Sequence, residues 1–378
     1  MGWFIGGLLF LVLGYFAYGR VIERILGPDG RSTPATELAD GVDYVPLPKW
    51  KNMLIQLLNI AGVGPVIGVI AGIKFGKVAL LIIPVGCVFI GAVHDFASGF
   101  VSLRMKGANL PAIVSAMLGK AYAAVFSVAL IFLLILMVAV FVNIPASLID
   151  RTVFPAVPLF TAMAVAIFAY YIIATLFPVD KIIGAIYPYF GGLLVVGSLA
   201  MCVALLVAGF QSPELLQESP AFLKYRAEVF DAGGRSPLFP LLFVTIACGI
   251  VSGFHATQSP IVARTMRSER EARTTYYGMM IAEGVIAMIW AAAALAMYNK
   301  DPATLYLAPA DVLGRVTTWL LGPWMGGVTV FAIVVLAVTS GDTGLRSARM
   351  SLAEILGIPQ KKILPRILVC LPLVVLVA

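Results

Sequence analysis

Long apolar stretches run through the whole chain, and they constrain its fold more than any other feature of the sequence. Most of them reach the length of about 20 residues that a helix needs to cross the hydrocarbon core of a bilayer. The stretches are Gly2–Gly19, Met53–Ile73, Val78–Leu103, Tyr122–Asn143, Val157–Phe177, Ile183–Phe210, Leu238–Ala263, Tyr276–Tyr298, Met325–Ser340 and Ile363–Ala378. Their apolar residues are continuous rather than alternating, which excludes a transmembrane β-barrel. We therefore predict an all-α polytopic membrane protein.

The composition supports this prediction. Hydrophobic residues make up 61% of the 378-residue chain and charged residues 12%, against about 45–50% and about 25% in soluble domains. This small number of charged side chains could not cover the surface of a soluble protein of this size. A soluble enzyme is therefore excluded. The net charge of +7 does not indicate a nucleic-acid partner, because membrane proteins concentrate Lys and Arg on the cytoplasmic side of the bilayer.

The basic residues also predict an orientation. One set of alternate loops carries 18 of the 26 Lys and Arg residues, and the other set carries 8. The more basic loops are residues 20–52, 104–121, 178–182, 264–275 and 341–366. By the positive-inside rule these face the cytoplasm, which places the N-terminus outside. Residues 2–19 lack a basic leader and an Ala-x-Ala cleavage site, so we predict a retained helix rather than a signal peptide.

Two of the predicted spans are interrupted by small and helix-breaking residues. The first break is Gly62-Val-Gly-Pro65-Val-Ile-Gly68, and the second begins at Gly249 and ends at Pro260. The helix after each break carries one acid, Asp95 or Glu283, and these acids are 188 residues apart. The two interrupted spans are five positions apart in the order of spans, which is an odd number, so they run in opposite directions. Such paired breaks are typical of inverted-repeat transporters, where they mark the substrate site.

This pattern predicts a single transmembrane transporter domain over residues 1–378. Residues 2–19 form an extra N-terminal helix, residues 53–210 a first repeat, and residues 238–378 a second, incomplete repeat. Gly-rich helices can also simply pack closely together. Two breaks at matched spacing, each followed by an acid, favour the transporter interpretation.

The residues around the breaks are candidates for substrate binding. Backbone N–H groups freed where a helix is interrupted favour anions such as a carboxylate. Short polar side chains after the second break could complete this site, or could only cap the backbone. The predicted substrate-binding residues are Gly62, Gly64, Pro65, Gly68, Ser252, His255, Thr257 and Gln258.

Ionisable residues inside the apolar stretches are candidates for proton coupling. An Asp at the centre of a membrane helix costs at least about 2.5–3.5 kcal/mol, and such residues are usually functional. Asp95 and Glu283 are of this kind, and the two histidines of the chain, His94 and His255, lie beside the acid and the second break. A histidine can transfer a proton or donate to a carboxylate. We predict proton coupling through His94, Asp95 and Glu283, with structural hydrogen bonding between helices as the alternative.

Several ordered motifs resemble one known family. They are Asp40-Gly-Val-Asp-Tyr44-Val-Pro46, Ile60-Ala-Gly-Val-Gly-Pro65-Val-Ile-Gly68, Gly91-Ala-Val-His94-Asp95-Phe96, Phe243-Val-Thr-Ile-Ala-Cys-Gly249-Ile-Val-Ser-Gly-Phe-His255 and Ser340-Gly-Asp342-Thr-Gly-Leu-Arg346. From about Gly27 to about Leu356 the chain resembles the carbon starvation protein A (CstA) family of bacterial inner-membrane transporters. The resemblance implies a leucine-transporter-like fold with discontinuous helices, in the amino acid–polyamine–cation superfamily. It also implies uptake of peptides or pyruvate during nutrient limitation.

The resemblance further implies a sodium site. In similar folds, two hydroxyl groups on the helix that corresponds to residues 325–340 bind the ion together with carbonyl groups of the first broken helix. The resemblance therefore assigns Thr339 and Ser340 as ligands. Oxygen ligands suit hard cations, but both hydroxyls could instead bond back to their own helix. One face of the following helix is predicted to form a cytoplasmic gate or a structural ion pair, and it carries Asp342, Arg346 and Arg349.

Together these features predict an ion-coupled secondary transporter in the bacterial inner membrane, linked to carbon starvation. Its substrate is a small carboxylate nutrient, pyruvate or a short peptide, and its coupling ion is H⁺ or Na⁺, with no other cofactor. The sequence has no P-loop or nucleophile elbow, so neither ATP-driven transport nor an enzyme is expected. The alternative is a membrane enzyme or nutrient sensor that uses the buried His, Asp and Glu residues.

Overall fold

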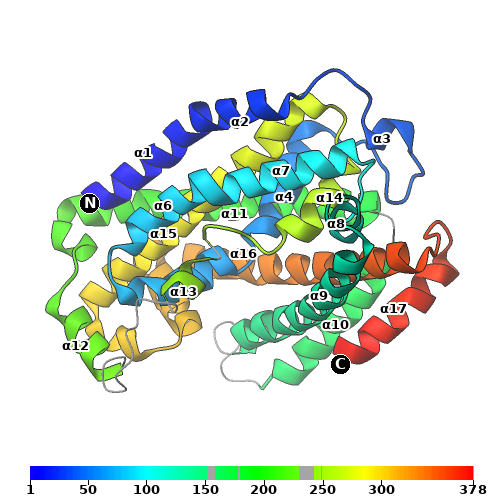
Figure 1. Ribbon diagram of the computed structural model, residues 1–378. Helices are drawn as coiled ribbons and strands as arrows, with labels where there is room; N and C mark the ends of the chain where they lie inside the picture. Colours follow the sequence, from blue (N-terminus) through cyan, green and yellow to red (C-terminus); the bar gives the residue numbers. More distant parts are fainter. Residues whose placement is uncertain (151–157, 178, 230–241, 248, 378) are drawn as a thin grey trace.

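The computed structural model describes residues 1–150, 158–177, 179–229, 242–247 and 249–377, and within these ranges it contains helices and no strands (Figure 1). The predicted spans that begin at Val157 and Leu238 start outside the described residues. Among the described residues, six helical stretches are long and apolar enough to cross a membrane, and a bent helix pair makes a seventh. The prediction of a polytopic helical membrane protein is confirmed.

The N-terminal third holds the extra helix and the first broken helix. Helix α1 (Gly2–Phe16) continues through Ala17 into α2 (Tyr18–Leu26) as one 25-residue span. Helix α4 (Lys49–Ala61) is followed, after a bend of 48°, by the π-helix η1 (Gly64–Gly68) and α5 (Val69–Gly72). The next span runs through α6 (Ala79–Gly86), η3 (Cys87–Gly91) and α7 (Ala92–Arg104).

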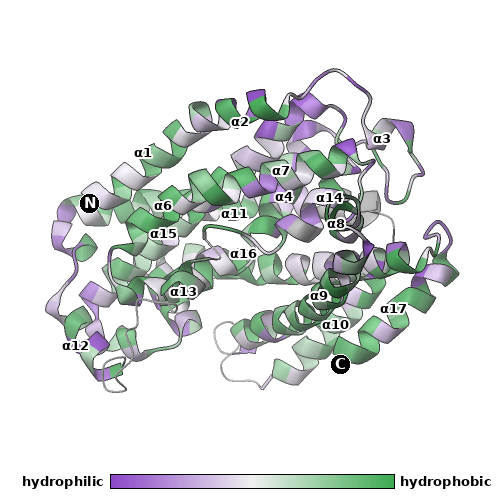
Figure 2. Ribbon diagram, in the orientation of Figure 1, coloured by the Kyte–Doolittle hydropathy of each residue, from purple (hydrophilic) through white to green (hydrophobic). Residues whose placement is uncertain are grey.

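The remaining helices range from 5 to 48 residues in length. They are α8 (Leu110–Leu118), α9 (Lys120–Leu148), α10 (Phe160–Leu176), α11 (Val179–Gln211), α12 (Pro220–Val229), α13 (Phe243–Ala247), α14 (His255–Ala263), α15 (Gly278–Lys300), α16 (Pro309–Leu356) and α17 (Ile363–Val377). Figure 2 shows mostly apolar colouring over α9, α10 and α17, whereas polar residues gather around α12 and α3 (Pro34–Glu37). This distribution fits helices whose outer faces contact lipid.

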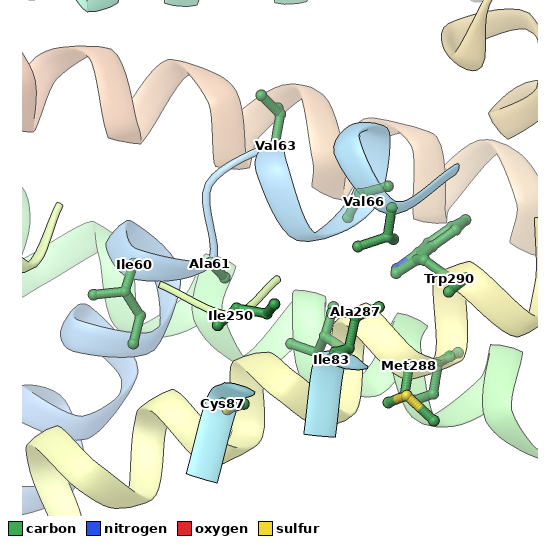
Figure 3. Packing of buried hydrophobic residues seen from close by; sticks show 14 of the residues in the cluster. Ile60, Ala61, Val63, Val66, Ile83, Cys87, Ile250, Ala287, Met288 and Trp290 are labelled. Carbon is green, nitrogen blue, oxygen red and sulfur yellow. The ribbon is translucent and has the colours of Figure 1, made fainter. Parts of the chain in front are cut away.

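Helix α15 is the central element of the fold. In its most apolar stretch 83% of the residues are buried, against 22–56% for the other long spans. Its side chains Ala287, Met288 and Trp290 pack beneath the first broken helix, where the chain leaves α4 at Ala61 and turns through Val63 (Figure 3). The first broken helix therefore rests on one buried helix.

Close packing by glycine attaches the extra N-terminal helix to this centre. A Cβ atom at Gly7 would lie 2.5 Å from the Met288 side chain, and one at Gly14 would lie 2.5 Å from Val88. Only glycine allows so close an approach. The predicted extra helix is thus part of the packed structure, along one edge of the molecule (Figure 1).

The predicted span Met325–Ser340 lies within a longer helix. Helix α16 begins at Pro309 and ends at Leu356, with one kink at Gly322, whose φ is 75°. Residues 309–321, expected in an outward loop, are therefore helical. The helix also continues past Ser340, because its charged residues are buried against neighbouring helices and Gly341 admits the Tyr171 hydroxyl, 2.2 Å from where a Cβ would lie.

Candidate functional site

The first break is shorter than the sequence indicates. Helix α4 ends at Ala61, and Gly62 adopts φ 41° and ψ −162°, which a residue with a Cβ rarely adopts. The prediction that Gly64, Pro65 and Gly68 are unwound is wrong, because these residues form η1. Pro65 lacks an N–H and fits the first turn of a helix, where that donor has no partner.

The second break occupies residues 249–254, and α14 begins at His255. Thr257 and Gln258 are therefore helical rather than unwound, which corrects the sequence prediction. The Phe254 carbonyl accepts hydrogen bonds from the N–H groups of Thr257 (3.1 Å) and Gln258 (2.7 Å), and these bonds close the first turn.

The structure brings the two breaks together. The Ser252 hydroxyl donates to the Ile60 carbonyl at 2.8 Å, directly before the first break. A Cβ at Gly62 would lie 3.7 Å from the Phe254 ring and 3.8 Å from the Ser340 hydroxyl oxygen. The candidate site is thus built from both broken helices and from α16.

Asp95 connects the two broken helices through its carboxylate. The Gln56 side-chain amide of α4 donates to both of its oxygens, at 3.0 and 2.9 Å. The Ser259 hydroxyl of α14 donates to Oδ1 at 2.6 Å. Asp95 is fully buried, and its hydrogen-bond donors among the described residues are neutral, so a proton or a bound cation must balance its charge.

The two histidines face each other across α7 and α14. Their Nδ1 atoms are 3.0 Å apart, and the rings stack with centroids 5.3 Å apart. In a hydrogen bond of this kind only one of the two nitrogens carries the proton. His94 is exposed on the helix surface, whereas His255 is fully buried with Nε2 3.1 Å from the Met280 sulfur. The pair therefore links the surface of the helix bundle to the second break.

Glu283 faces the second break from α15. One turn before it, Met280 contacts His255, and one turn after it, Ala287 lies 2.9 Å from where a Cβ at Gly249 would stand. Neither oxygen of this fully buried carboxyl group has a hydrogen-bond partner among the described residues. Both polar atoms of the Gln258 side-chain amide are likewise buried without a described partner. Unpaired buried polar groups of this kind are uncommon and indicate a missing proton or ligand.

The hydroxyls of Thr339 and Ser340 both donate to the Leu336 carbonyl, at 3.0 and 2.9 Å. Hydrogen bonding of both hydroxyls to their own helix is the alternative to sodium binding that the sequence left open. Donation uses the hydroxyl proton and leaves the oxygen lone pairs available to a cation.

The charged face of α16 contains no internal ion pair, since Asp342 forms no salt bridge with Arg346 or Arg349 among the described residues. Arg349 instead pairs with Asp43, at 3.9 Å. Asp342 accepts from the Tyr187 hydroxyl. Arg346 donates to carbonyls at the end of α10, including that of Phe177 at 3.0 Å. These arginines can bind elsewhere because each is fully buried against a different neighbouring segment.

Sequence reasoning missed a polar face on the first broken helix. Asn52, Gln56 and Asn59 are spaced at i, i+4 and i+7, so they share one face of α4, and all three are fully buried. Asn52 pairs with Thr265, Gln56 with Asp95, and Asn59 accepts from the Thr343 hydroxyl. Three polar residues at this spacing in an apolar helix are a signal that could have been read from the sequence.

Sequence reasoning also missed that Gly91 determines how closely two elements of the site approach each other. A Cβ at this position would lie 1.7 Å from the Ile250 carbonyl oxygen in the second break. Gly91 therefore lets the helix that carries His94 and Asp95 approach the unwound backbone.

Comparison with known proteins identifies the family. The family model described as carbon starvation protein CstA matches residues 3–168 and 159–321. A membrane protein of Haemophilus influenzae is 42% identical over 346 residues, which are 80% of this chain and 93% of that protein. The peptide transporter CstA of Campylobacter jejuni is 28% identical, over 88% of this chain and 55% of its own length.

A third relative is named for a different substrate. The pyruvate/proton symporter BtsT of Escherichia coli is 26% identical over 68% of this chain and 43% of its own length. The chain thus spans about half the length of the peptide and pyruvate transporters that it matches. Among solved structures, that of MhsT in complex with L-phenylalanine aligns over 88% of this chain and 79% of its own, with a TM-score of 0.60 and 16% identity. The predicted leucine-transporter-like fold is confirmed.

The packing at Gly91 predicts a sharp steric effect. We expect Gly91→Ala to lower stability by about 1–3 kcal/mol, because the new methyl group overpacks a site next to rigid backbone, and to abolish transport by displacing Ile250. Thermal unfolding in detergent measures the stability. Gly192→Ala is the matched control, since a Cβ there has no neighbour within 4 Å. Equal melting temperatures for the two variants would contradict the prediction.

Proposed function

The chain belongs to the carbon starvation protein CstA family of transporters, and from this premise we propose that it is an ion-coupled symporter for a small carboxylate nutrient, pyruvate or a short peptide. We place it in a bacterial inner membrane with its N-terminus outside, in keeping with the distribution of its basic residues. Residues 53–210 and 238–378 form the two repeats in this proposal. The relatives are named as transporters, so the enzyme alternative is set aside.

The observation that carries the proposal is the double attachment of Asp95. Its carboxylate holds Gln56 of one broken helix and Ser259 of the other. An ionised carboxylate accepts strongly from both donors, whereas a protonated one gives up part of its accepting capacity and becomes a donor. Protonation of Asp95 therefore changes how tightly the two broken helices are held together. This links proton binding to the movement that opens and closes the site.

His94, His255 and Glu283 supply the rest of the proton route in this proposal. The imidazole pair spans from the exposed face of α7 to the buried end of α14, and Glu283 faces the same break. A histidine pair that shares one proton can pass it on by exchanging donor and acceptor roles. Glu283 has no described hydrogen-bond partner, so it can receive that proton without breaking an existing bond.

The substrate carboxylate is assigned to the space between the breaks. Among the described residues of the two breaks, the backbone N–H groups of Gly62, Ser252 and Gly253 make no hydrogen bond, and such groups favour anions. The unpartnered Gln258 amide adds two N–H donors. Gly62, Ser252, His255, Thr257 and Gln258 are the nearest of the predicted binding residues, with Gly64, Pro65 and Gly68 in the π-helix just beyond.

Sodium is the second candidate for the coupling ion. Ser340 lies beside Gly62, and both the Thr339 and Ser340 oxygens retain lone pairs. Neutral hydroxyl and carbonyl ligands suit a hard monovalent ion. A sodium ion here would join α16 to the first broken helix, just as Asp95 joins the two broken helices.

Uptake by purified protein in proteoliposomes tests the function. We expect accumulation of labelled pyruvate or of a labelled dipeptide under an inward proton or sodium gradient, and no accumulation without one. Empty liposomes are the control. Failure to accumulate either substrate under both gradients would argue against the proposed function.

Replacement of the bridging acid tests proton coupling. We expect Asp95→Asn to abolish proton-driven accumulation while substrate exchange without a gradient continues, because the amide keeps the shape but cannot take up a proton. Parallel measurements of net uptake and of exchange separate the two activities. Glu214→Gln, at an exposed acid, should leave both unchanged. Proton-driven accumulation by Asp95→Asn would exclude Asp95 as the coupling site.

The hydroxyl pair tests sodium coupling. Thr339→Val combined with Ser340→Ala deletes two oxygen ligands while nearly preserving volume. If sodium binds here, we expect the sodium concentration for half-maximal uptake to rise at least about tenfold, which corresponds to 1.4 kcal/mol of binding energy. Titration of uptake with sodium measures this change. Wild-type uptake that is unaffected when potassium replaces sodium would eliminate the sodium site and leave the proton.

A further inference from the structure

Helix α6 carries an exposed ridge with an apolar groove on each side. Leu81 and Val85 lie one turn apart on this ridge, and their side chains are 49% and 39% exposed. Both residues line two separate cavities, one of about 520 Å³ towards α13 and one of about 540 Å³ towards α1. All the described residues that line either cavity are apolar. The ridge therefore separates two grooves that suit hydrocarbon rather than water.

Each groove has about the length of one leaflet of a bilayer. The groove towards α13 follows the span from Leu81 to Ile90, which is about 13.5 Å at a rise of 1.5 Å per residue. The groove towards α1 follows that helix from Gly2 to Phe10, which is about 12 Å. The hydrocarbon core of a bilayer is about 30 Å thick, so one leaflet contributes about 15 Å. One acyl chain can therefore lie along each groove.

A basic and an aromatic residue mark the same end of both grooves. Lys77 precedes α6 and Trp3 lies in the first turn of α1, and the Lys77 Nζ atom is 5.9 Å from the centre of the Trp3 ring. Tryptophan is enriched at the interface between membrane and water. Glu218 accepts from the Lys77 backbone N–H at 3.4 Å, but its carboxylate is paired with Arg226. Among the described residues the Lys77 ammonium forms no salt bridge, so it is available to a phosphate group.

We propose that this surface binds one anionic phospholipid that has two acyl chains. Its phosphate lies at Lys77, and its chains straddle the ridge of Leu81 and Val85, one in each groove. A basic residue near the bilayer surface attracts an anionic headgroup, and the grooves bury the chains that follow from it. The site goes beyond the proposed function, because it takes a component of the membrane rather than a nutrient.

The bound lipid contacts the second break. Ile250 and Val251 belong to that break and line the groove towards α13. An acyl chain in this groove packs against both side chains. A ligand that binds only the folded arrangement stabilises it by mass action. Bound lipid should therefore raise the stability of the protein.

Thermal unfolding of delipidated protein in detergent tests the site. We expect dioleoyl phosphatidylglycerol to raise the melting temperature until the site is saturated. Lys77→Gln should raise the lipid concentration for half the maximal shift about fivefold, because one basic residue near an anionic headgroup contributes that much to binding. Lys77→Arg should restore the wild-type value, since it keeps the charge.

A second variant tests the groove towards α1. Gly6→Leu should weaken lipid binding, because Gly6 lines this groove and a Cβ there has no neighbour within 4 Å. The new side chain therefore occupies the space of the acyl chain without a clash. Gly192→Leu on α11 is the matched control, since a Cβ at Gly192 is equally free. Unchanged lipid binding in either Lys77→Gln or Gly6→Leu would overturn the site.

Three further ligands identify what the site takes. Dioleoyl phosphatidylcholine has the same chains without net charge, and lysophosphatidylglycerol has one chain, so both should bind more weakly. Inorganic phosphate should cause no shift. Equal binding of the one-chain and two-chain lipids, equal binding of the neutral lipid, or stabilisation by phosphate alone would contradict the proposal.

Photo-crosslinking gives a second measurement on the unaltered chain. A phosphatidylglycerol that carries a diazirine on one acyl chain should label residues of α1, α6 or α13. Labelling confined to other helices would exclude this site, even if a variant fails to fold. Neither measurement needs substrate or an ion gradient, so failed uptake would count only against the proposed function.

Discussion

Backbone groups within a bilayer must find hydrogen-bond partners inside the protein, and both helix breaks meet this requirement with side chains. Ser252 of the second break satisfies the Ile60 carbonyl next to the first. The Tyr276 hydroxyl donates to the Ser259 carbonyl at 3.1 Å, and the Tyr298 hydroxyl donates to the Ile70 carbonyl at 3.0 Å. The breaks are therefore held against each other and against the tyrosines that flank or end α15.

Helix α15 can support both broken helices because of its side-chain sizes. Four consecutive alanines, residues 291–294, are fully buried, and small side chains let neighbouring helices approach closely. Glu283 is the one acid of this helix and has no described hydrogen-bond partner. A buried carboxyl group without a partner is costly in such a helix, so packing alone does not explain it. Its position beside the second break favours the proton role proposed above.

The sequence predicted features that depend on local pattern and missed those that depend on tertiary contact. Apolar stretches, the two breaks and the acids that follow them could all be found from composition and spacing. The extent of the breaks could not, because the helical conformation of Gly64–Gly68 and of Thr257 depends on particular backbone bonds. Nor could the partners of Asp95 be predicted, since Gln56 and Ser259 lie 39 and 164 residues away in the chain. Residues 309–321 were assigned to a loop because Asp311 and Arg315 lower the hydropathy of this segment, although it is helical.

Helix α14 connects Asp95 to the residues that precede the first broken helix. It has nine residues, with His255 at its beginning, Ser259 bonded to Asp95 in its middle, and Arg264 directly after its end. Ser259 and Arg264 are five residues apart, which is about 7.5 Å along a helix. Directly after this helix, the Thr265 carbonyl accepts from the Leu47 N–H at 2.9 Å, so the end of α14 is bonded to the residues that lead into α4. In the proposed mechanism, a proton on Asp95 thus acts on both broken helices through one short helix, which is the kind of physical connection that coupling between distant sites requires.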